Sequence, residues 1–459
     1  MESETHMYVK RSMHRRWILV ATVLPFAVAF ACGGSDDSVG LNGTDGGDSD
    51  DSPSAEKDAT RTNPGDGAAP VVTTYNDFTD KALWQFYDFS VLLGQADANI
   101  PIGFLGAVFD GKYMYYTPTG HATTGTSTSD NYDMLRFDTG AAFDAPTSYS
   151  AVNLGFLGTG LAYVGATFDG RFVYPAPYVG APFTRLDTKG SFGDIDASWN
   201  FGSTSTSAQF GAIFDGNNVY YAPISAGRVT RLDTHDGGLG TFDISAIDGG
   251  GHAYQGVVFD GRYAYFVPSA PSGPGNASHV LRLDTQADFN APTSWTTFDT
   301  STLDPKAQDF TGGVFDGRYL YLAPTSTNIA TPTDVRFVRF DTKADFSKPT
   351  SWQSFAPMPD AQSLAYHTAG FDGRYVYYLP FVATGAFNLL RYDTTASFGD
   401  AAAWSSIDTT TFNPGATGYE GVGFDGRWIY LVPRFGKIGA RFDAKSPSSI
   451  PPGFSGSFL

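Results

Sequence analysis

The sequence predicts an all-β protein built from seven similar units, and three observations lead to that prediction. Each unit carries the tripeptide Phe-Asp-Gly between two runs of apolar and aromatic residues, which is the pattern of a β-hairpin. The tripeptide recurs at intervals of 45 to 59 residues, a period typical of a β-propeller. Each unit also has room for four antiparallel strands. We therefore expect a seven-bladed β-propeller of four-stranded antiparallel blades. The copies begin at Phe109, Phe168, Phe214, Phe259, Phe315, Phe371 and Phe424.

The unit 255–300 shows how the strands are read from the sequence. A first apolar run ends at Phe259, where Asp-Gly predicts a tight turn because both residues tolerate a positive φ. The second run ends at Pro268, since proline cannot donate to a ladder. A third run ends at Asp284, whose side chain favours a turn, and 294–298 predicts the fourth strand.

The second run of each unit is apolar at every position rather than at alternate positions. In the fourth unit Tyr263 and Tyr265 face one way, and Ala264 between them is apolar as well. A strand that is apolar on both faces is buried on both. This is what radially stacked blades require.

Closure of the ring is predicted from the two ends of the chain. Most units carry a Phe six residues before an aromatic residue in the fourth strand; the second unit stretches this spacing to seven, and the third unit lacks the pair. The last unit stops near Asp443 without a fourth strand, whereas Phe78 and Trp84 show the spacing before the first Phe-Asp-Gly. We expect the N-terminal strand to complete the last blade, which leaves no open sheet edge.

Residues 1–32 have the features of an export signal. Basic residues precede an apolar run, Trp17 to Ala31, that is too short to span a bilayer comfortably. Cys32, the only cysteine, ends this run, and Ala29-Phe-Ala-Cys resembles a bacterial lipobox, although Phe30 departs from the usual pattern. That resemblance implies lipidation of Cys32, and Gly33 after it implies sorting to an outer membrane. The alternative is an ordinary Ala-x-Ala cleavage site that releases a soluble secreted protein.

Residues 33–72 are rich in Gly, Asp, Ser and Thr and poor in large apolar residues, so this segment cannot bury enough surface to fold. Nine acidic residues against Lys57 and Arg61 place seven of the chain's 18 net negative charges here. We expect an acidic tether, followed by the propeller over 73–459. Its Asp runs lack the ligand spacing of a calcium loop.

An Arg-x-Asp sequence recurs in the third strand of every unit, as does the Asp of Phe-Asp-Gly. A group needed once for catalysis would not be repeated seven times, so we interpret these residues as turn-forming and blade-to-blade hydrogen-bonding groups. A functional site should instead consist of residues that break the repeat. The Arg residues are Arg136, Arg185, Arg231, Arg282, Arg339, Arg391 and Arg441.

The strand order places the loops after each Pro and the loops into each next unit on one rim, where length and sequence vary most. An aromatic residue begins most first strands, and the residue after it changes character from unit to unit. His367, Glu420 and Gln255 are therefore candidates for acid–base work at the mouth of the central channel. The alternative is a solvated rim that carries no chemistry. Candidate binding residues are Tyr254, Phe310, Thr311, Tyr366 and Tyr419. The alternative for the aromatic residues among them is a role as core that plugs the channel.

Several classes of partner and chemistry are disfavoured. An isoelectric point near 4.6 with no basic cluster argues against nucleic acid. We expect no metal and no cofactor, because the sequence has no short metal-binding spacing such as His-x-x-x-His and no phosphate-binding glycine loop.

The repeat resembles that of β-propeller proteins, and most of all the Phe-Asp-Gly-Arg-Tyr propellers of bacterial lipoproteins. It lacks the Gly-His and Trp-Asp marks of WD40 repeats and the paired glycines of kelch. The resemblance implies architecture and no activity. We expect a monomeric, membrane-tethered binding module for a glycan, peptide or protein. The alternative is a propeller lyase or hydrolase that acts on polysaccharide, with its site at the channel mouth.

Overall fold

The computed structural model describes residues 72–94, 102–120, 122–124, 127–129, 131–155, 162–178, 180–194, 199–204, 207–224, 227–248, 253–269, 278–325, 335–357, 365–451, 453–454 and 456–458. Contacts divide the chain into Met1–Ala68 and Ala69–Leu459, and every described residue belongs to the second unit. The predicted export signal with Cys32 lies outside the described residues, as does nearly all of the predicted tether.

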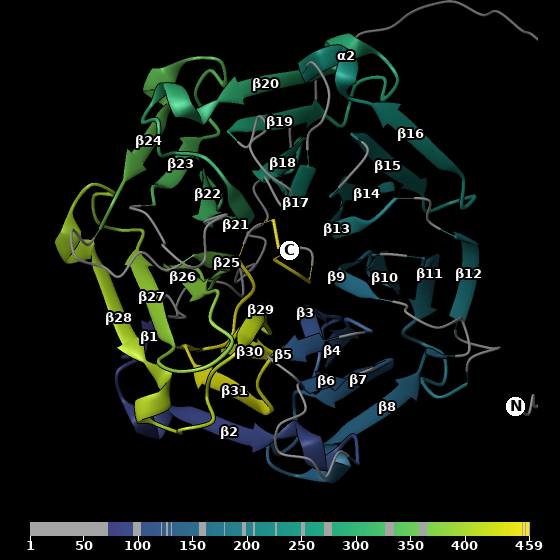
Figure 1. Ribbon diagram of the computed structural model, residues 1–459, viewed down its shortest axis with the longest axis vertical. Coiled ribbons are helices and arrows are strands. Elements are labelled where there is room, and N and C mark those ends of the chain that lie inside the picture. Colours follow the sequence, from purple (N-terminus) through teal and green to yellow (C-terminus); the bar gives the residue numbers. More distant parts are fainter. Residues whose placement is uncertain are drawn as a thin grey trace, which may run out of the picture. The chain divides into compact units, whose positions relative to one another are not determined.

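Seven four-stranded antiparallel sheets form the blades of a propeller, as predicted (Figure 1). The first three blades are β3 (Phe104–Phe109), β4 (Tyr113–Pro118), β7 (Asp133–Asp138) and β8 (Tyr149–Asn153); β9 (Tyr163–Phe168), β10 (Phe172–Pro177), β11 (Pro182–Asp187) and β12 (Trp199–Thr204); and β13 (Gln209–Phe214), β14 (Asn218–Pro223), β15 (Arg228–Asp233) and β16 (Leu239–Asp243). The next three are β17 (Ala253–Phe259), β18 (Tyr263–Ser269), β19 (His279–Asp284) and β20 (Trp295–Asp299); β21 (Phe310–Phe315), β22 (Tyr319–Pro324), β23 (Phe337–Asp341) and β24 (Trp352–Phe355); and β25 (Tyr366–Phe371), β26 (Tyr375–Pro380), β27 (Asn388–Asp393) and β28 (Trp404–Asp408). The seventh is β29 (Tyr419–Phe424), β30 (Trp428–Pro433), β31 (Ile438–Asp443) and β2 (Trp84–Asp88).

Short elements connect these strands. A small hairpin pairs β5 (Ala122–Thr124) with β6 (Ser127–Ser129), and α2 (Ser245–Asp248) is a single helical turn. No helix within the described ranges is both long and apolar enough to span a bilayer. The 3-10 helices among the described residues are Lys81–Leu83, Phe89–Val91, Pro146–Ser148, Pro292–Ser294, Thr300–Thr302, Pro349–Ser351, Ala401–Ala403 and Thr409–Thr411.

The first strand of each blade lies at the centre of the ring and contacts the first strands of both neighbours, in the order β3, β9, β13, β17, β21, β25, β29 and back to β3 (Figure 1). The fourth strands lie at the circumference. The second strands are buried at nearly every position, as their apolar sequences predict. Their side chains therefore fill the space between adjacent blades.

The N-terminal strand closes the ring, which confirms the predicted closure. Strand β2 pairs with β31 so that Trp84 lies opposite Phe442. The Trp84 ring stacks on Phe442 with centroids 5.1 Å apart, and its Nε1–H donates to the carbonyl oxygen of Phe78 at 2.8 Å. A further pair of short strands, β1 (Thr74–Tyr75) and β32 (Lys445–Ser446), joins the start of the described chain to the segment that follows β31. The closing contact thus combines a backbone ladder with buried aromatic packing.

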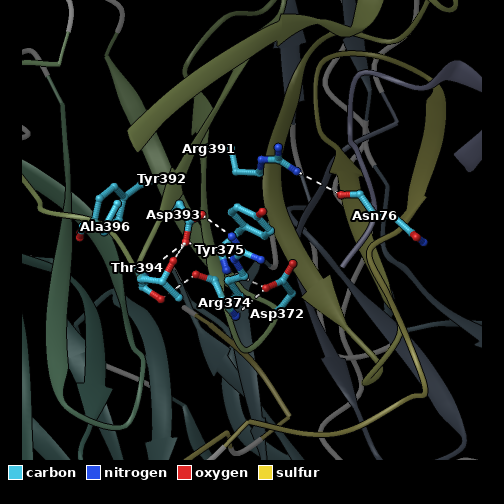
Figure 2. Close-up of polar contacts among 10 residues, drawn as sticks. Asn76, Asp372, Arg374, Tyr375, Arg391, Tyr392, Asp393, Thr394 and Ala396 are labelled. Carbon is cyan, nitrogen blue, oxygen red and sulfur yellow. Dashed lines mark hydrogen bonds and ion pairs between the residues drawn. The ribbon is translucent and has the colours of Figure 1, made fainter. Parts of the chain in front are cut away.

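The repeated Asp and Arg residues are structural, as interpreted, but the two types act in different ways. In the sixth blade Asp372 accepts hydrogen bonds from the backbone of Arg374 and Tyr375, so it organises its own hairpin. The Asp of Arg-x-Asp, Asp393, is likewise bound within its blade by the guanidinium of Arg374 (Figure 2). Only the Arg residue connects blades: Arg391 donates to the backbone oxygen of Asn76 at 3.3 Å and stacks on aromatic rings.

The C-terminal tail ends at the centre of the ring (Figure 1), a feature that the sequence analysis did not anticipate. It contacts the ends of the first strands that lead into the Asp-Gly hairpins, so it lies on the Asp-Gly side of the domain. The N–H of Phe109 in β3 donates to the carbonyl oxygen of Gly456 at 2.8 Å, and Phe454 packs on Phe424 of β29. Phe458 is only 7% exposed. The tail leaves a cavity of only about 30 Å³ against β17 and β21. This end of the channel is therefore closed by the chain itself.

Candidate binding site at the channel mouth

The residues that break the repeat form a ring around the other end of the channel, each directly after the aromatic residue near the start of a first strand. Three successive blades contribute an apolar residue or Gly at this position, and the next four contribute a polar one. Leu105 and Val164 pack with Phe210 in one buried apolar cluster. The ring is thus divided into an apolar and a polar half. Its members are Leu105, Val164, Gly211, Gln255, Thr311, His367 and Glu420.

The aromatic residues proposed as a binding surface lie inside the protein. Tyr254, Phe310 and Tyr419 are fully buried and Tyr366 is 6% exposed. Tyr366 packs against Phe337 with centroids 5.1 Å apart, and Tyr419 packs similarly on Phe387 at 5.0 Å. These rings fill the core behind the channel mouth and hold the following residue in place. Their proposed contact with a ligand stays a prediction.

His367 lies between aromatic rings from two blades. It stacks on Phe381 with centroids 5.2 Å apart and meets the edge of Phe210 at 5.6 Å. Phe210 belongs to the third blade and His367 to the sixth, so this contact crosses the channel. Burial, assisted by the positive charge of Arg434, lowers the pKa of His367 against the opposing effect of Glu420. The imidazole is therefore neutral near pH 7.

Glu420 is fully buried and forms an ion pair with Arg434, which follows the last residue of β30. His367 Nε2 lies 3.9 Å from Glu420 Oε1. One polar atom of each residue has no hydrogen-bond partner among the described residues: His367 Nδ1, Glu420 Oε1 and Arg434 Nε. Buried polar atoms are normally satisfied, so this cluster has the capacity to bind a further polar group. Arg434, whose side chain is 26% exposed, is the member that reaches solvent.

Gln255 belongs to a second polar group on the fourth and fifth blades. Its Oε1 accepts hydrogen bonds from Ser269 Oγ at 2.8 Å and Thr311 Oγ1 at 3.1 Å. Ser269 also lies 3.3 Å from Asp309 Oδ1. The structure therefore brings His367 together with Glu420, and Gln255 together with Thr311. Whether any of them is catalytic stays a prediction.

The sequence analysis missed three residues of the channel mouth, although the sequence carries a signal for them. They are Arg434, Phe381 and Ser269. Each directly follows the Pro that ends a second strand. Since the first and second strands are antiparallel, that position lies beside the variable position of the first strand. The two variable positions thus form matched pairs, Glu420 with Arg434, His367 with Phe381 and Gln255 with Ser269. Within the described residues, no three His, Cys, Asp or Glu side chains gather to hold a metal ion.

Comparison with known proteins bears on the fold. No protein-family model matches the sequence, and no curated protein is significantly similar to it. Among solved structures, YCF48 bound to a D1 peptide is similar with a TM-score of 0.50 and 11% identity, over 80% of this chain and 97% of that one.

Two further structures give lower TM-scores. The β-propeller domain of Cps50 (Swd1) from Myceliophteria thermophila has a TM-score of 0.46 at 10% identity, over 74% of this chain and 98% of that one. Hydrazine synthase from Kuenenia stuttgartiensis has a TM-score of 0.49 at 12% identity, over 74% of this chain and 94% of that one. At such low identity a likeness shows the fold alone. By its own sheet topology, the chain is a seven-bladed β-propeller.

Proposed function

We propose that this protein is a binding module that holds a ligand at the open mouth of its channel. The observation that carries the proposal is the buried cluster of Glu420, Arg434 and His367. Three of its polar atoms have no hydrogen-bond partner among the residues that the structure describes, and the cluster reaches solvent through Arg434. The opposite mouth is closed by the C-terminal tail, so one rim is left for recognition. A neutral imidazole and a guanidinium together suit an amide or hydroxyl group.

Such groups occur in peptides and in glycans, and a peptide or protein is the partner we favour. Arg is enriched at protein interfaces, and the similarly folded YCF48 was solved with a peptide. The test is a screen of the full chain against peptide and glycan arrays. Binding of the selected ligand should weaken at least about tenfold in His367→Asn, which removes a partly unsatisfied hydrogen-bonding group. The control, Arg262→Lys on the opposite rim, should bind as the wild type does. Equal binding by His367→Asn would contradict the proposal.

The polysaccharide enzyme is the second candidate, and the 3.9 Å approach of His367 to Glu420 favours it. A histidine beside a carboxylate can act as a general base. Released products measured in the same glycan wells would separate the two functions. Product release that is lost in His367→Asn would establish the enzyme. Ligand retention without products would support the binding module.

We also propose that the domain works outside the cytoplasm, tethered through a lipid on Cys32. The apolar run that ends at this lone cysteine and the acidic segment behind it support the proposal. Expression in a Gram-negative bacterium with labelled palmitate should label the wild type and place it in the membrane fraction. Cys32→Ser should lose both properties. An unlabelled wild type in the soluble periplasmic fraction would favour the released form instead.

A further inference from the structure

A repeated arrangement locks most blades to their neighbours. The guanidinium of the Arg in each third strand lies between two aromatic rings, one from its own blade and one from the turn before the fourth strand of the next blade. The ring-to-guanidinium distances range from 3.9 to 4.9 Å in the five complete copies. These are Arg136 (Tyr113 and Phe192), Arg282 (Tyr263 and Phe346), Arg339 (Tyr319 and Phe398), Arg391 (Tyr375 and Phe78) and Arg441 (Trp428 and Phe143).

The third blade cannot supply its ring. Only five residues, 234–238, connect β15 to β16, against the ten residues 342–351 between β23 and β24. The shorter turn is a tight hairpin in which the N–H of Asp233 donates to the carbonyl oxygen of Gly238 at 2.9 Å. It has no Phe. Leu239 takes the place of the fourth-strand Trp, because it pairs with Leu232 as Trp352 pairs with Phe340.

These changes leave Arg185 of the second blade with an incomplete stack. Phe172 of its own blade lies 4.3 Å from the guanidinium, and it is the only aromatic ring in the described part of the chain that stacks on Arg185. A cavity of about 420 Å³ occupies the place of the second ring. Cavities of about 150 Å³ already bind benzene, so this one has room for an aromatic side chain.

The lining of the cavity matches such a side chain. Tyr174, Phe183, Leu232 and Leu239 form its apolar wall, and Arg185 supplies the cation. Leu239 is 39% exposed, unusually so for a large apolar side chain in this protein. A cation beside an apolar wall attracts the face of an aromatic ring. In the five complete copies the protein fills the equivalent place with Phe.

The chain outside the described residues offers few rings to occupy this cavity. The predicted tether, 33–72, contains no aromatic residue, and the aromatic residues outside the described ranges are Tyr8, Trp17, Phe26, Phe30 and Phe156. The first four fall in the predicted export signal. Strand β8 ends at Asn153, on the opposite rim from the turn 234–238, and Phe156 follows three residues later in the sequence. A ring supplied by another molecule is therefore the natural occupant.

We propose that the cavity between the second and third blades, lined by Arg185 and Leu239, is a docking site for an aromatic side chain of a partner polypeptide. The partner's ring stacks on Arg185 as Phe346 stacks on Arg282. The site lies on the rim that carries the Asp-Gly hairpins, and the channel mouth with His367 lies on the other rim. It therefore stands or falls independently of the function proposed above.

Small probes test this directly on the full chain. N-acetyl-L-tryptophanamide and N-acetyl-L-phenylalaninamide, titrated by NMR, should bind, and N-acetyl-L-leucinamide should bind at least about fivefold more weakly because it cannot stack on the guanidinium. Leu239→Trp should block the cavity and abolish binding. Since Leu239 is exposed and a Trp stands at the equivalent place in other blades, this variant should keep or raise the melting temperature.

Matched variants identify the cation. Arg185→Met should weaken binding of the tryptophan probe at least about fivefold, whereas Arg282→Met, whose stack is already complete, should leave it unchanged. His367→Asn should also leave it unchanged, which separates this site from the channel mouth. The proposal is overturned if the aromatic probes do not bind, if the leucine probe binds equally well, or if binding survives in Leu239→Trp.

Discussion

Replacing Trp84 by alanine should destabilise the protein and open the ring at its closing contact. Trp84 is 6% exposed, stacks on Phe442 and donates a hydrogen bond to the Phe78 carbonyl oxygen at 2.8 Å. Truncation of a buried Trp to Ala costs about 3 to 5 kcal/mol. Because stacking and a buried hydrogen bond are lost together, we expect a loss of about 4 kcal/mol in the free energy of unfolding.

Trp352→Ala is the matched control. Trp352 is 3% exposed, stacks on Phe340 at 4.5 Å and donates to the Phe346 carbonyl oxygen at 2.9 Å. The strand of Trp352, β24, is linked to its pairing partner β23 by the turn 342–351, whereas β2 pairs with β31 without a connecting turn. Both variants should lose similar stability in urea unfolding followed by circular dichroism.

Hydrogen exchange separates the two variants. Only Trp84→Ala should show fast exchange confined to 84–88 and 438–443, because detaching β2 needs no other blade to open. A loss below about 1 kcal/mol, or unchanged exchange in β31, would refute the view that this contact closes the ring.

Three further predictions concern the interior. Burial raises the pKa of Asp372 to about 6, so the folded protein holds this proton more tightly than the unfolded chain and the free energy of unfolding falls as pH rises from 3.8 to about 6. Asp372→Asn should remove that slope in urea melts at several pH values, and Asp316→Asn in the equivalent hairpin should not. Gly256→Ala should cost at least about 2 kcal/mol more than Gly261→Ala. Both have a φ near 100°, but only at Gly256 would the new Cβ lie 2.8 Å from the Gly312 backbone; equal losses in thermal unfolding would contradict the close approach. Glu420→Gln should cost about 3 kcal/mol by leaving the Arg434 charge without its partner, and much of this should return in the double variant with Arg434→Gln. Additive losses in that cycle would show that the two residues are not coupled.

The channel mouth shows where sequence reasoning reaches its limit. The break in the repeat singled out His367, Glu420 and Gln255, because a residue type that changes at an equivalent position is visible in the sequence. Their grouping was not visible, since it depends on contacts such as Phe210 with His367 across the channel. Arg434 belongs to the cluster through a pairing of strands whose register the sequence does not state.

The sequence by itself determined the number of blades, the strands of each blade and the closure by Trp84, because all three follow from a local pattern repeated along the chain. The tertiary structure alone decided that the C-terminal tail fills the channel and that Arg185 faces a cavity. The place of the tail and the size of the cavity both depend on the distances between neighbouring blades after they have packed. A missing Phe in the third unit is plain in the sequence, but whether neighbouring side chains close over the gap or leave it open is decided by packing in three dimensions.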